Sequence, residues 1–434
     1  MAYTEGMAGQ IDNAATSRVV IIGGGFGGLA FCQQFRGKAN LVLIDKQNHH
    51  LFQPLLYQVA MTGLAAPDIA SPLRHIFRRH RHISVHMAEV RSVDLKQKTV
   101  TANGRVVEYD YLVLGMGGRT SYFGNNHWDK HALGLKTLDD ALTIRRRILS
   151  SFEIAENIDD EAERRRLMTI VVVGGGPTGL ELAGSIAELT SRVFRKDFRR
   201  INTADARIIL IEGADRLLSN YPESLSKKAE EQIKELGVEV QLNTKVREVS
   251  EGIVELASGE VIEARNILWG AGVEAIPMTR TLGVPVDRAG RILVEPDLSL
   301  PGHPEVFAVG DLAAVKQADG SDVPGVAPAA MQMGRYVADQ IAKGLTGDSE
   351  TSVTAEPFVY RDKGSMATIG RSRAVAWIGS LRFGGFMAWI AWLTIHLFFL
   401  VTFRNKLFVL TNWIISYFSY GRGARIIFRA DPDR

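Results

Sequence analysis

Two glycine-rich segments of this chain have the residue types and spacing of loops that bind phosphate. They are Gly23-x-Gly25-x-x-Gly28 and Gly174-x-Gly176-x-x-Gly179. Such glycines let the backbone turn tightly, and they let a pyrophosphate approach the N-terminus of the following helix, where free N–H groups favour an anion. The sequence therefore predicts two dinucleotide sites, and a plain glycine-rich turn is the alternative for each loop.

Each loop is followed by an acidic residue at the end of the next apolar run. Asp45 lies 22 residues beyond Gly23, the expected spacing for a carboxylate that binds an adenosine ribose. Glu212 lies 38 residues beyond Gly174, and the basic stretch 192–200 accounts for the excess as a longer helix or a surface loop. A carboxylate at this position repels a 2′-phosphate, so we expect the second site to prefer NADH to NADPH.

The segments around the two loops predict two βαβ units. Apolar runs typical of strands buried on both faces of a parallel sheet lie at 18–22, 41–45, 169–173 and 208–212. Helices are expected at 29–35 and 180–194. Two dinucleotide sites in one chain imply two dinucleotides, and FAD with NAD(P)H is the economical pair. A further strand at 306–309 ends next to Asp311 and is expected to return to the first domain, which places Asp311 near the flavin.

The predicted fold class is α/β, with two Rossmann-like dinucleotide-binding domains and a C-terminal membrane-associating helical region. We expect a flexible arm at 1–17, a FAD-binding domain at 18–140 and 286–345, a connecting region with solvated faces at 141–166, an NADH-binding domain at 167–285, a small β-rich piece at 346–383, and membrane-associating helices with a basic tail at 384–434.

Composition excludes several classes of protein. Among 434 residues, 46% are hydrophobic and 23% charged, which argues against a disordered or fibrous chain. A net charge of +3 is too small to suggest a nucleic-acid partner. The single cysteine, Cys32, excludes a cysteine redox pair and a cysteine-rich metal site. Any redox chemistry must therefore come from a bound cofactor.

Four histidines lie within residues 75–86, and they are the strongest hint of a metal. Their neighbours Arg74, Arg78, Arg79 and Arg81 would repel a cation. We therefore expect a basic surface helix and no metal site.

Four segments resemble type II NADH dehydrogenase, the single-subunit NADH:quinone oxidoreductase of the two-dinucleotide-domain flavoprotein reductase superfamily. They lie at 50–60, 174–184, 323–332 and 358–370. The resemblance covers roughly residues 18–425, and its first and last segments are not general to flavoproteins.

The resemblance implies a role for particular residues. FAD is held by Gly23, Gly24, Gly25, Gly27, Gly28, Asp45, Lys46, Val90, Asp311, Ala327 and Lys363. NADH is held by Gly174, Gly176, Pro177, Gly179, Glu181, Glu212 and Gly272. The catalytic residues are Glu181, beside the nicotinamide and the flavin, and Lys363, near the flavin pyrimidine. Quinone contacts fall on Gln53, Pro328, Gln332 and Met366. The family usually has glutamine where this chain has Pro328, which affects the contact to the quinone head group.

The implied activity is that of a non-proton-pumping NADH:quinone oxidoreductase of a respiratory chain, in which FAD takes hydride from NADH and passes two electrons to a membrane quinone. A sulfide:quinone oxidoreductase is an alternative, but it depends on redox cysteines. An NADH-dependent flavoprotein reductase with a soluble acceptor, and an NADH-sensing flavoprotein with an association role, are further alternatives. Steady-state NADH oxidation with a quinone separates these functions.

The C-terminal region predicts contact with a lipid bilayer. Residues 384–403 contain no Asp, Glu, Lys or Arg, and a helix of this length, about 30 Å, could span a bilayer core. The next apolar run, 407–418, is too short to cross back. Trp389, Trp392 and Trp413 are expected at the headgroup boundary, and flanking basic residues suit anionic lipid. We expect peripheral attachment to the cytoplasmic face of the cell membrane; a spanning helix and a buried hairpin or dimer face are the alternatives. A homodimer is also expected.

Overall fold

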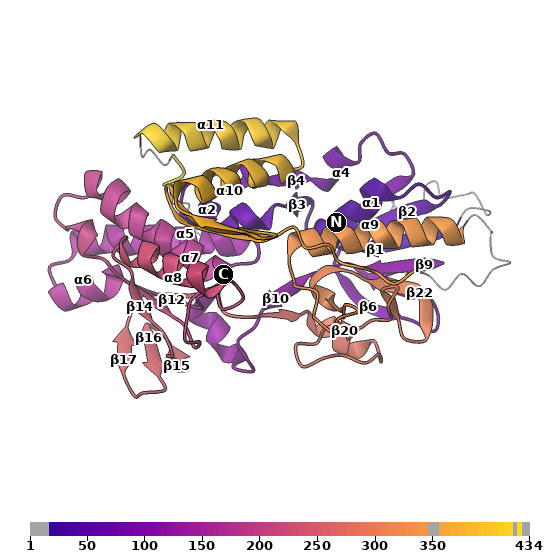
Figure 1. Cartoon of the computed structure of the whole chain (residues 1–434), viewed down its shortest axis with the longest axis horizontal. Coiled ribbons are helices and arrows are strands. Elements are labelled where there is room, and N and C mark those ends of the chain that lie inside the picture. Colours follow the sequence, from indigo (N-terminus) through magenta and orange to yellow (C-terminus); the bar gives the residue numbers. More distant parts are fainter. Residues whose placement is uncertain (1–16, 346–355, 420–422, 428–434) are drawn as a thin grey trace. The chain divides into compact units, whose positions relative to one another are not determined.

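The computed structural model describes residues 17–345, 356–419 and 423–427. These residues form two compact units (Figure 1). Among the described residues, unit 1 comprises 17–50, 72–118, 275–345 and 356–361, and unit 2 comprises 51–71, 119–274, 362–419 and 423–427. All but the last residue of the expected arm at 1–17 lies outside the described residues.

A six-stranded sheet forms the centre of unit 1, in the order β21-β22-β9-β1-β2-β5. Its strands are β1 (Arg18–Ile22), β2 (Asn40–Asp45), β5 (Ile83–Met87), β9 (Tyr111–Leu114), β21 (Ser299–Leu300) and β22 (His303–Ala308). β1 runs parallel to β2 and to β9, and β22 runs parallel to β9. The prediction that the strand near 306–309 returns to the first sheet is therefore confirmed.

Two helices of unit 1 pack against each other at a pair of glycines. They are α1 (Phe26–Gln34) and α9 (Ala327–Gly344). A Cβ at Gly334 of α9 would lie only 2.2 Å from the carbonyl oxygen of Gly27 in α1, so a side chain at Gly334 would force the helices apart. Cys32 of α1 is 1% exposed, and burial raises the pKa of its thiol to about 12. Cys32 is therefore a buried, protonated core residue.

The remaining elements of unit 1 are small. They are the antiparallel strands β6 (Val90–Asp94), β7 (Thr99–Ala102) and β8 (Arg105–Glu108), the pair β20 (Ile292–Leu293) and β23 (Ala313–Ala314), and α4 (Leu73–Ile76). The expected basic surface helix over residues 75–86 is wrong, because α4 has four residues and β5 begins at Ile83. Four short strands lie where the chain passes between the units: β3 (His49–Leu51), β4 (Ala70–Pro72), β10 (Gly118–Thr120) and β19 (Val273–Ala275).

Unit 2 contains a five-stranded parallel sheet in the order β11-β18-β12-β13-β14. The strands are β11 (Ala132–Gly134), β12 (Thr169–Val173), β13 (Arg207–Ile211), β14 (Glu239–Gln241) and β18 (Asn266–Trp269). An antiparallel meander of β15 (Val246–Ser250), β16 (Ile253–Leu256) and β17 (Val261–Glu263) completes this part. β12 is buried along its whole length, as its uninterrupted apolar sequence predicts.

The helices of this part of unit 2 are α5 (Leu138–Asn157), α6 (Glu161–Met168), α7 (Pro177–Glu188) and α8 (Glu223–Lys234). α7 continues through a π-helical turn, Leu189–Val193, which together with the following loop accounts for the long spacing before Glu212. The expectation of solvated faces over 141–166 needs correction at Arg145. This side chain is 7% exposed, and its guanidinium donates to the carbonyl oxygens of Val59 and Leu64.

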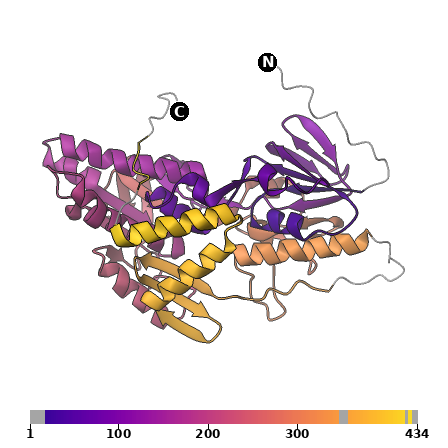
Figure 2. The same ribbon diagram turned by 90° about the horizontal axis from the view of Figure 1, so that it is seen from above.

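The C-terminal part of unit 2 is a three-stranded antiparallel sheet followed by two helices. The strands are β24 (Ser365–Gly370), β25 (Arg373–Ile378) and β26 (Leu381–Gly384), and the helices are α10 (Phe386–Phe399) and α11 (Phe403–Ser419). α2 (Leu56–Ala60) and α3 (Ala66–Ile69) belong to the same unit. Both views show α10 and α11 together on one outer side of it (Figures 1 and 2).

The predicted helix over 384–403 is shorter than expected, because residues 400–402 break the chain into two helices. Among the described residues, no helix is both long and apolar enough to cross a membrane. Trp392 is also not at a headgroup boundary. It is 1% exposed and stacks on His396 with ring centroids 4.0 Å apart.

Candidate functional site

Two glycines of the loop in unit 1 are required by the fold, because a side chain at either position would collide with the backbone. Gly23 has a φ of +105°, and a Cβ there would lie 2.2 Å from the carbonyl oxygen of Gly115. A Cβ at Gly28 would lie 1.9 Å from the carbonyl oxygen of Gly23. Unit 2 repeats this arrangement. Gly174 has a φ of +108°, and a Cβ at Gly179 would lie 1.8 Å from the carbonyl oxygen of Gly174.

The middle glycine of each loop is different. Gly25 and Gly176 have φ values of −70° and −74°, which any residue can adopt. The nearest protein atom to a Cβ would lie 3.9 Å away at Gly25, and none lies within 4 Å at Gly176 in the described chain. Neither backbone conformation nor packing within the described chain calls for glycine at these two positions. A Cβ there would instead point into open space beside the loop, and its absence leaves that space free for a pyrophosphate.

The helix that follows each loop is ready to bind an anion. α1 begins at Phe26 and α7 at Pro177, directly after the middle glycine. No described side chain caps either N-terminus, so the first N–H groups are available to a phosphate. Pro177 occupies the first position of α7, where an N–H would have no partner within the helix.

The two strand-end acids make the same contacts in their separate units. Asp45 accepts from the N–H groups of Gly24 at 2.5 Å and Gln47 at 2.7 Å. Glu212 accepts from those of Gly175 at 2.5 Å and Ala214 at 2.7 Å. An ionised carboxylate has about four acceptor sites, so each acid can also accept from ribose hydroxyls. Both acids are only partly buried.

His50, in β3, contacts the glycine loop of unit 1, and sequence reasoning missed this role. Its ring is 2% exposed, its Nδ1 lies 2.9 Å from the carbonyl oxygen of Gly24, and it packs edge-on against Phe26. Burial lowers the pKa of His50 to about 4. The ring is therefore neutral at physiological pH and donates from Nδ1. One indication of this role was present in the sequence, because His50 is the first residue of the 50–60 segment that carries the family resemblance.

The other residues predicted for FAD lie as follows. Lys46 is exposed after β2, Val90 begins β6, and Ala327 begins α9. Asp311 lies in a 3-10 turn (Gly310–Leu312) just after β22. This strand end is close to the glycine loop, because a Cβ at Gly27 would lie 2.8 Å from the Val309 side chain. Lys363 belongs to unit 2.

Glu181 lies on α7 where the helix packs on β24. A Cβ at Gly184 would lie 1.6 Å from the carbonyl oxygen of Ile369, so glycine is required at this crossing. Glu181 accepts from the N–H of Thr368, and burial raises the pKa of its carboxyl well above the usual range. The hydroxyl of Tyr221 bonds Ser365, and burial together with the charge of Glu181 raises the pKa of that hydroxyl.

Two further predicted residues lie elsewhere in unit 2. Gly272 has a φ of +78°, and a Cβ there would lie 2.7 Å from the ring of Phe123. Lys363 is exposed in the loop before β24.

The four residues predicted for quinone contact fall in both units. In unit 1, Pro328 is the second residue of α9, and the amide of Gln332 bonds the main-chain N–H and carbonyl of Arg361, each at 3.0 Å. In unit 2, Gln53 donates to the carbonyl oxygen of Lys136 at 3.2 Å, and Met366 packs against the cluster beneath α10.

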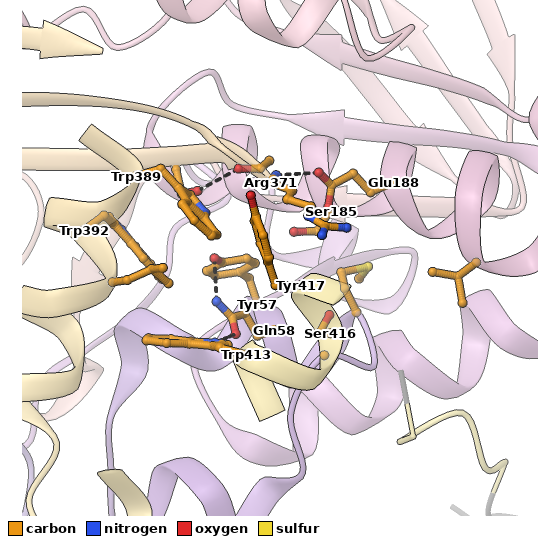
Figure 3. Close-up of a pocket in the computed structure, with 16 residues that line it drawn as sticks. Tyr57, Gln58, Ser185, Glu188, Arg371, Trp389, Trp392, Trp413, Ser416 and Tyr417 are labelled. Carbon is orange, nitrogen blue, oxygen red and sulfur yellow. Dashed lines mark hydrogen bonds between the residues drawn. The ribbon is translucent and has the colours of Figure 1, made fainter. Parts of the chain in front are cut away.

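Unit 2 also contains a pocket that the sequence did not indicate (Figure 3). It is open to solvent, and the empty space inside it and at its mouth together is about 830 Å³. It is lined by Tyr57, Gln58, Met61, Gly63, Ser185, Glu188, Val193, Thr368, Gly370, Arg371, Trp389, Trp392, Leu393, Trp413, Ser416 and Tyr417. Ser185 and Glu188 lie beside Arg371 on one side, and Gln58 lies beside Trp413 on the other. None of the four predicted quinone residues is among its lining residues.

Comparison with known proteins assigns the family. Residues 17–334 match the pyridine nucleotide-disulphide oxidoreductase model, and residues 363–423 match the NDH2 C-terminal domain model. The type II NADH:quinone oxidoreductase NdhA of Mycobacterium tuberculosis (strain ATCC 25618 / H37Rv) is 45% identical over 424 residues, which cover 94% of this chain and 89% of that protein. The chain belongs to the type II NADH:quinone oxidoreductases.

A second relative agrees with this assignment, and a solved structure shares the fold. The type II NADH:quinone oxidoreductase Ndh of the same Mycobacterium tuberculosis strain is 44% identical over 419 residues, which cover 94% of this chain and 89% of that protein. A solved structure of NDH2 from Plasmodium falciparum in complex with NADH shares the fold with a TM-score of 0.86 at 20% identity. That match covers 95% of this chain and 100% of the other.

Proposed function

We propose that this type II enzyme oxidises NADH and reduces a membrane quinone without pumping protons. The observation that carries the proposal is the pair of matching glycine loops, one in each unit, each with a strand-end acid beside it and open space over its middle glycine. The family membership supplies the reaction. Its cofactors are FAD and NADH.

Bound FAD would supply the redox chemistry, as a hydride acceptor for NADH and a two-electron donor for the quinone. We assign FAD to unit 1, where the N-terminus of α1 binds the pyrophosphate and Asp45 binds a ribose. We assign NADH to unit 2, where α7 and Glu212 have the same roles. Burial raises the pKa of the Glu181 carboxyl group well above its usual range, and so favours the neutral form that can carry a proton.

The remaining residue assignments follow the family. Lys363 supplies a positive charge for the flavin, and Gly272 contributes to the NADH site. Pro328, with Gln53, Gln332 and Met366, is assigned to the quinone. The bonds from Gln332 to Arg361 give it a positioning role in unit 1, since both ends of its amide are engaged there.

We propose that α10 and α11 attach the enzyme to the cytoplasmic face of the membrane, in contact with the lipid surface. Their outward side chains form an apolar face, which we name the lipid face: Phe386, Met387, Ile390, Phe398, Phe403, Leu407, Phe408, Leu410, Ile414, Ile415 and Phe418. Arg404 and Lys406 lie over the rings of Phe408 and Phe398 at 4.7 and 5.3 Å. Cations beside an apolar face suit an anionic leaflet.

The test is a two-acceptor assay on the purified protein. We expect NADH to bleach the flavin absorbance, and we expect steady-state NADH oxidation with a quinone and with a water-soluble acceptor. Oxidation with the soluble acceptor alone would instead support a soluble-acceptor reductase. Self-association as a homodimer stays a prediction, and the mass of the protein in detergent tests it.

A further inference from the structure

One face of α7 carries a polar stripe that ends in the pocket. Glu181, Ser185 and Glu188 are four and three residues apart, which places them on the same face of the helix. Ser185 and Glu188 line the pocket, whereas Glu181 lies one turn nearer the N-terminus of α7 and outside the lining. The close approach of Gly184 to Ile369 holds this face against β24, so the stripe keeps a fixed register with the strand.

Thr368 connects Glu181 with the pocket. Thr368, whose N–H donates to Glu181, is itself one of the lining residues. The other polar groups of the lining include the hydroxyl-bearing residues Tyr57, Ser416 and Tyr417. A roomy cavity with several polar partners is suited to ordered water.

We propose that this pocket is the proton entrance of the quinone-reducing step, and that water in it returns a proton to Glu181 through Glu188 and Ser185. The inference rests on the proposed function. NADH supplies two electrons and one proton, whereas the quinol product carries two added protons, so each turnover takes one proton from solution. Glu181 gives its proton toward the quinone and regains one from the stripe; no electron crosses this route.

The groups around the stripe are compatible with a relay. The N–H of Arg371 donates to Glu188, and the Arg371 guanidinium lies 4.1 Å from the centroid of the Tyr417 ring. Arg192 follows Glu188 by one helical turn, and Tyr57 faces the pocket from α2. On the far side, Tyr221 approaches Glu181, and His396 stacks on the lining residue Trp392. The hydroxyl of Ser185 can both accept and donate, as a relay requires.

The first test follows the proton itself and needs no turnover. Infrared spectroscopy of the flavin-loaded protein should show a protonated carboxyl band that disappears in Glu181→Gln. After transfer to D2O, this band should shift at least about tenfold more slowly in Glu188→Gln and in Ser185→Ala than in the wild type. Absence of the band, or unchanged exchange in both variants, overturns the proposal.

The matched control is Ser191→Ala. Ser191 lies in the π-helical turn after α7, and its hydroxyl donates to the carbonyl oxygen four residues earlier, but it does not line the pocket. Its removal should leave the exchange rate unchanged. Tyr221→Phe tests the rival route from the other side of Glu181. Slow exchange in Tyr221→Phe, with normal exchange in Glu188→Gln, would place the entrance there instead.

The second test separates the half-reactions by stopped flow. Glu188→Gln should leave flavin reduction by NADH unchanged, slow reoxidation by quinone about tenfold, and raise its solvent isotope effect. Glu188→Asp, which keeps a carboxylate, should restore most of the rate. Equal slowing of both half-reactions contradicts a proton role. If the wild type does not reduce quinone at all, the proposed function is refuted. If the wild type and the variants reduce quinone at the same rate, the proposed function stands and only the proton entrance is refuted.

Discussion

The carboxylate of Glu212 is fixed by two backbone N–H groups before any ligand arrives. Exchanging this charge should therefore change the nucleotide preference. Glu212→Ser with Ala214→Arg should shift the ratio of kcat/KM for NADPH over NADH upward by roughly tenfold to a hundredfold, because a hydrogen bond to a charged group contributes about 1.5–3 kcal/mol. Steady-state assays with both nucleotides measure it.

Glu212→Gln is the matched control, because it keeps an acceptor for Gly175 and removes only the charge. It should relieve the repulsion of a 2′-phosphate without adding an attraction, and so give a smaller shift. A wild type that uses NADPH as well as NADH would show that Glu212 is assigned wrongly.

His50 should make the glycine loop of unit 1 sensitive to acid. Its pKa is lowered from an ordinary value near 6.5 to about 4, so the folded protein favours the neutral ring. The resulting stability is present above pH 6.5 and is lost as the pH falls through 4, and the full loss is about 3 kcal/mol. Flavin release and Tm measured across this range should show the decline.

His50→Asn keeps a donor for the carbonyl oxygen of Gly24 and removes the titration. Its Tm should fall less than that of the wild type between pH 6.5 and 4, because only the wild type gains a buried charge. Parallel pH profiles of the two proteins would show that His50 is not the titrating group.

Single residues differ in how far the sequence reveals them. The glycines and the acids Asp45 and Glu212 could be predicted, because each sits at a fixed spacing from a strand that is apolar throughout. His50 was missed, because its contact with Gly24 follows no fixed spacing from a strand, and only its place at the start of the 50–60 segment pointed to it. Arg145 was misjudged for a similar reason: a guanidinium can be buried when carbonyl oxygens accept from it.

At the scale of elements, the N-terminus of α9 tolerates the unusual Pro328. Proline is its second residue, where an N–H would have no partner within the helix. Pro328→Gln should therefore change the Tm little, and it should alter the KM for quinone while flavin reduction by NADH stays nearly unchanged. Stopped-flow and steady-state assays separate these effects, and equal losses in both half-reactions would place Pro328 away from the quinone.

Polar side chains hold α11 to the rest of unit 2. The amide of Asn405, which is 4% exposed, donates to the carbonyl oxygen of Ala70 and to the hydroxyl of Ser71 at 3.3 and 3.2 Å. Asn405→Leu should destabilise the protein by about 1–3 kcal/mol, because the buried Ser71 hydroxyl and the partly buried Ala70 carbonyl oxygen lose this donor. Chemical denaturation measures the loss of stability.

Thr411→Val is the control for Asn405. The Thr411 hydroxyl donates only to a carbonyl oxygen of its own helix and is exposed, so its loss should change the stability by less than about 0.5 kcal/mol. Equal effects of the two substitutions would mean that Asn405 does not hold the helix.

The pocket and the burial of Trp392 could not be predicted at this scale. The lining comes from α2, α7, β24, α10 and α11, which are far apart in the sequence. The side of α10 that packs against β25 and the side that is exposed both consist mainly of apolar residues. The sequence of α10 therefore gives no sign of which tryptophan turns inward.

For the whole molecule, the lipid face should determine the binding to membranes. Phe398, Phe403 and Phe418 are 71%, 80% and 80% exposed, so their replacement by glutamate removes no core contact. Burying one such side chain contributes about 1.5–3 kcal/mol, so the triple variant should bind anionic vesicles at least a hundredfold more weakly. It should keep NADH oxidation with a water-soluble acceptor. Vesicle sedimentation and both assays check this.

Three exposed valines elsewhere give the matched control: Val106→Glu, Val261→Glu and Val359→Glu, at residues 65%, 54% and 66% exposed. These substitutions add the same charge and should leave vesicle binding nearly unchanged. Equal loss in both triple variants would attribute the effect to net charge instead of to the lipid face. Deleting the two helices is a poorer experiment, because α10 also covers the buried Ala374 and Ala376.

The burial of Cys32 also makes this enzyme convenient for labelling chemistry. The chain has no other cysteine, and this thiol is both inaccessible and protonated at neutral pH. Maleimides and methanethiosulfonates react with accessible thiolates, so the native enzyme should stay unlabelled. One cysteine introduced at an exposed position, such as Phe418→Cys, would then carry a fluorophore or spin label as the sole reporter, with no background from the rest of the chain.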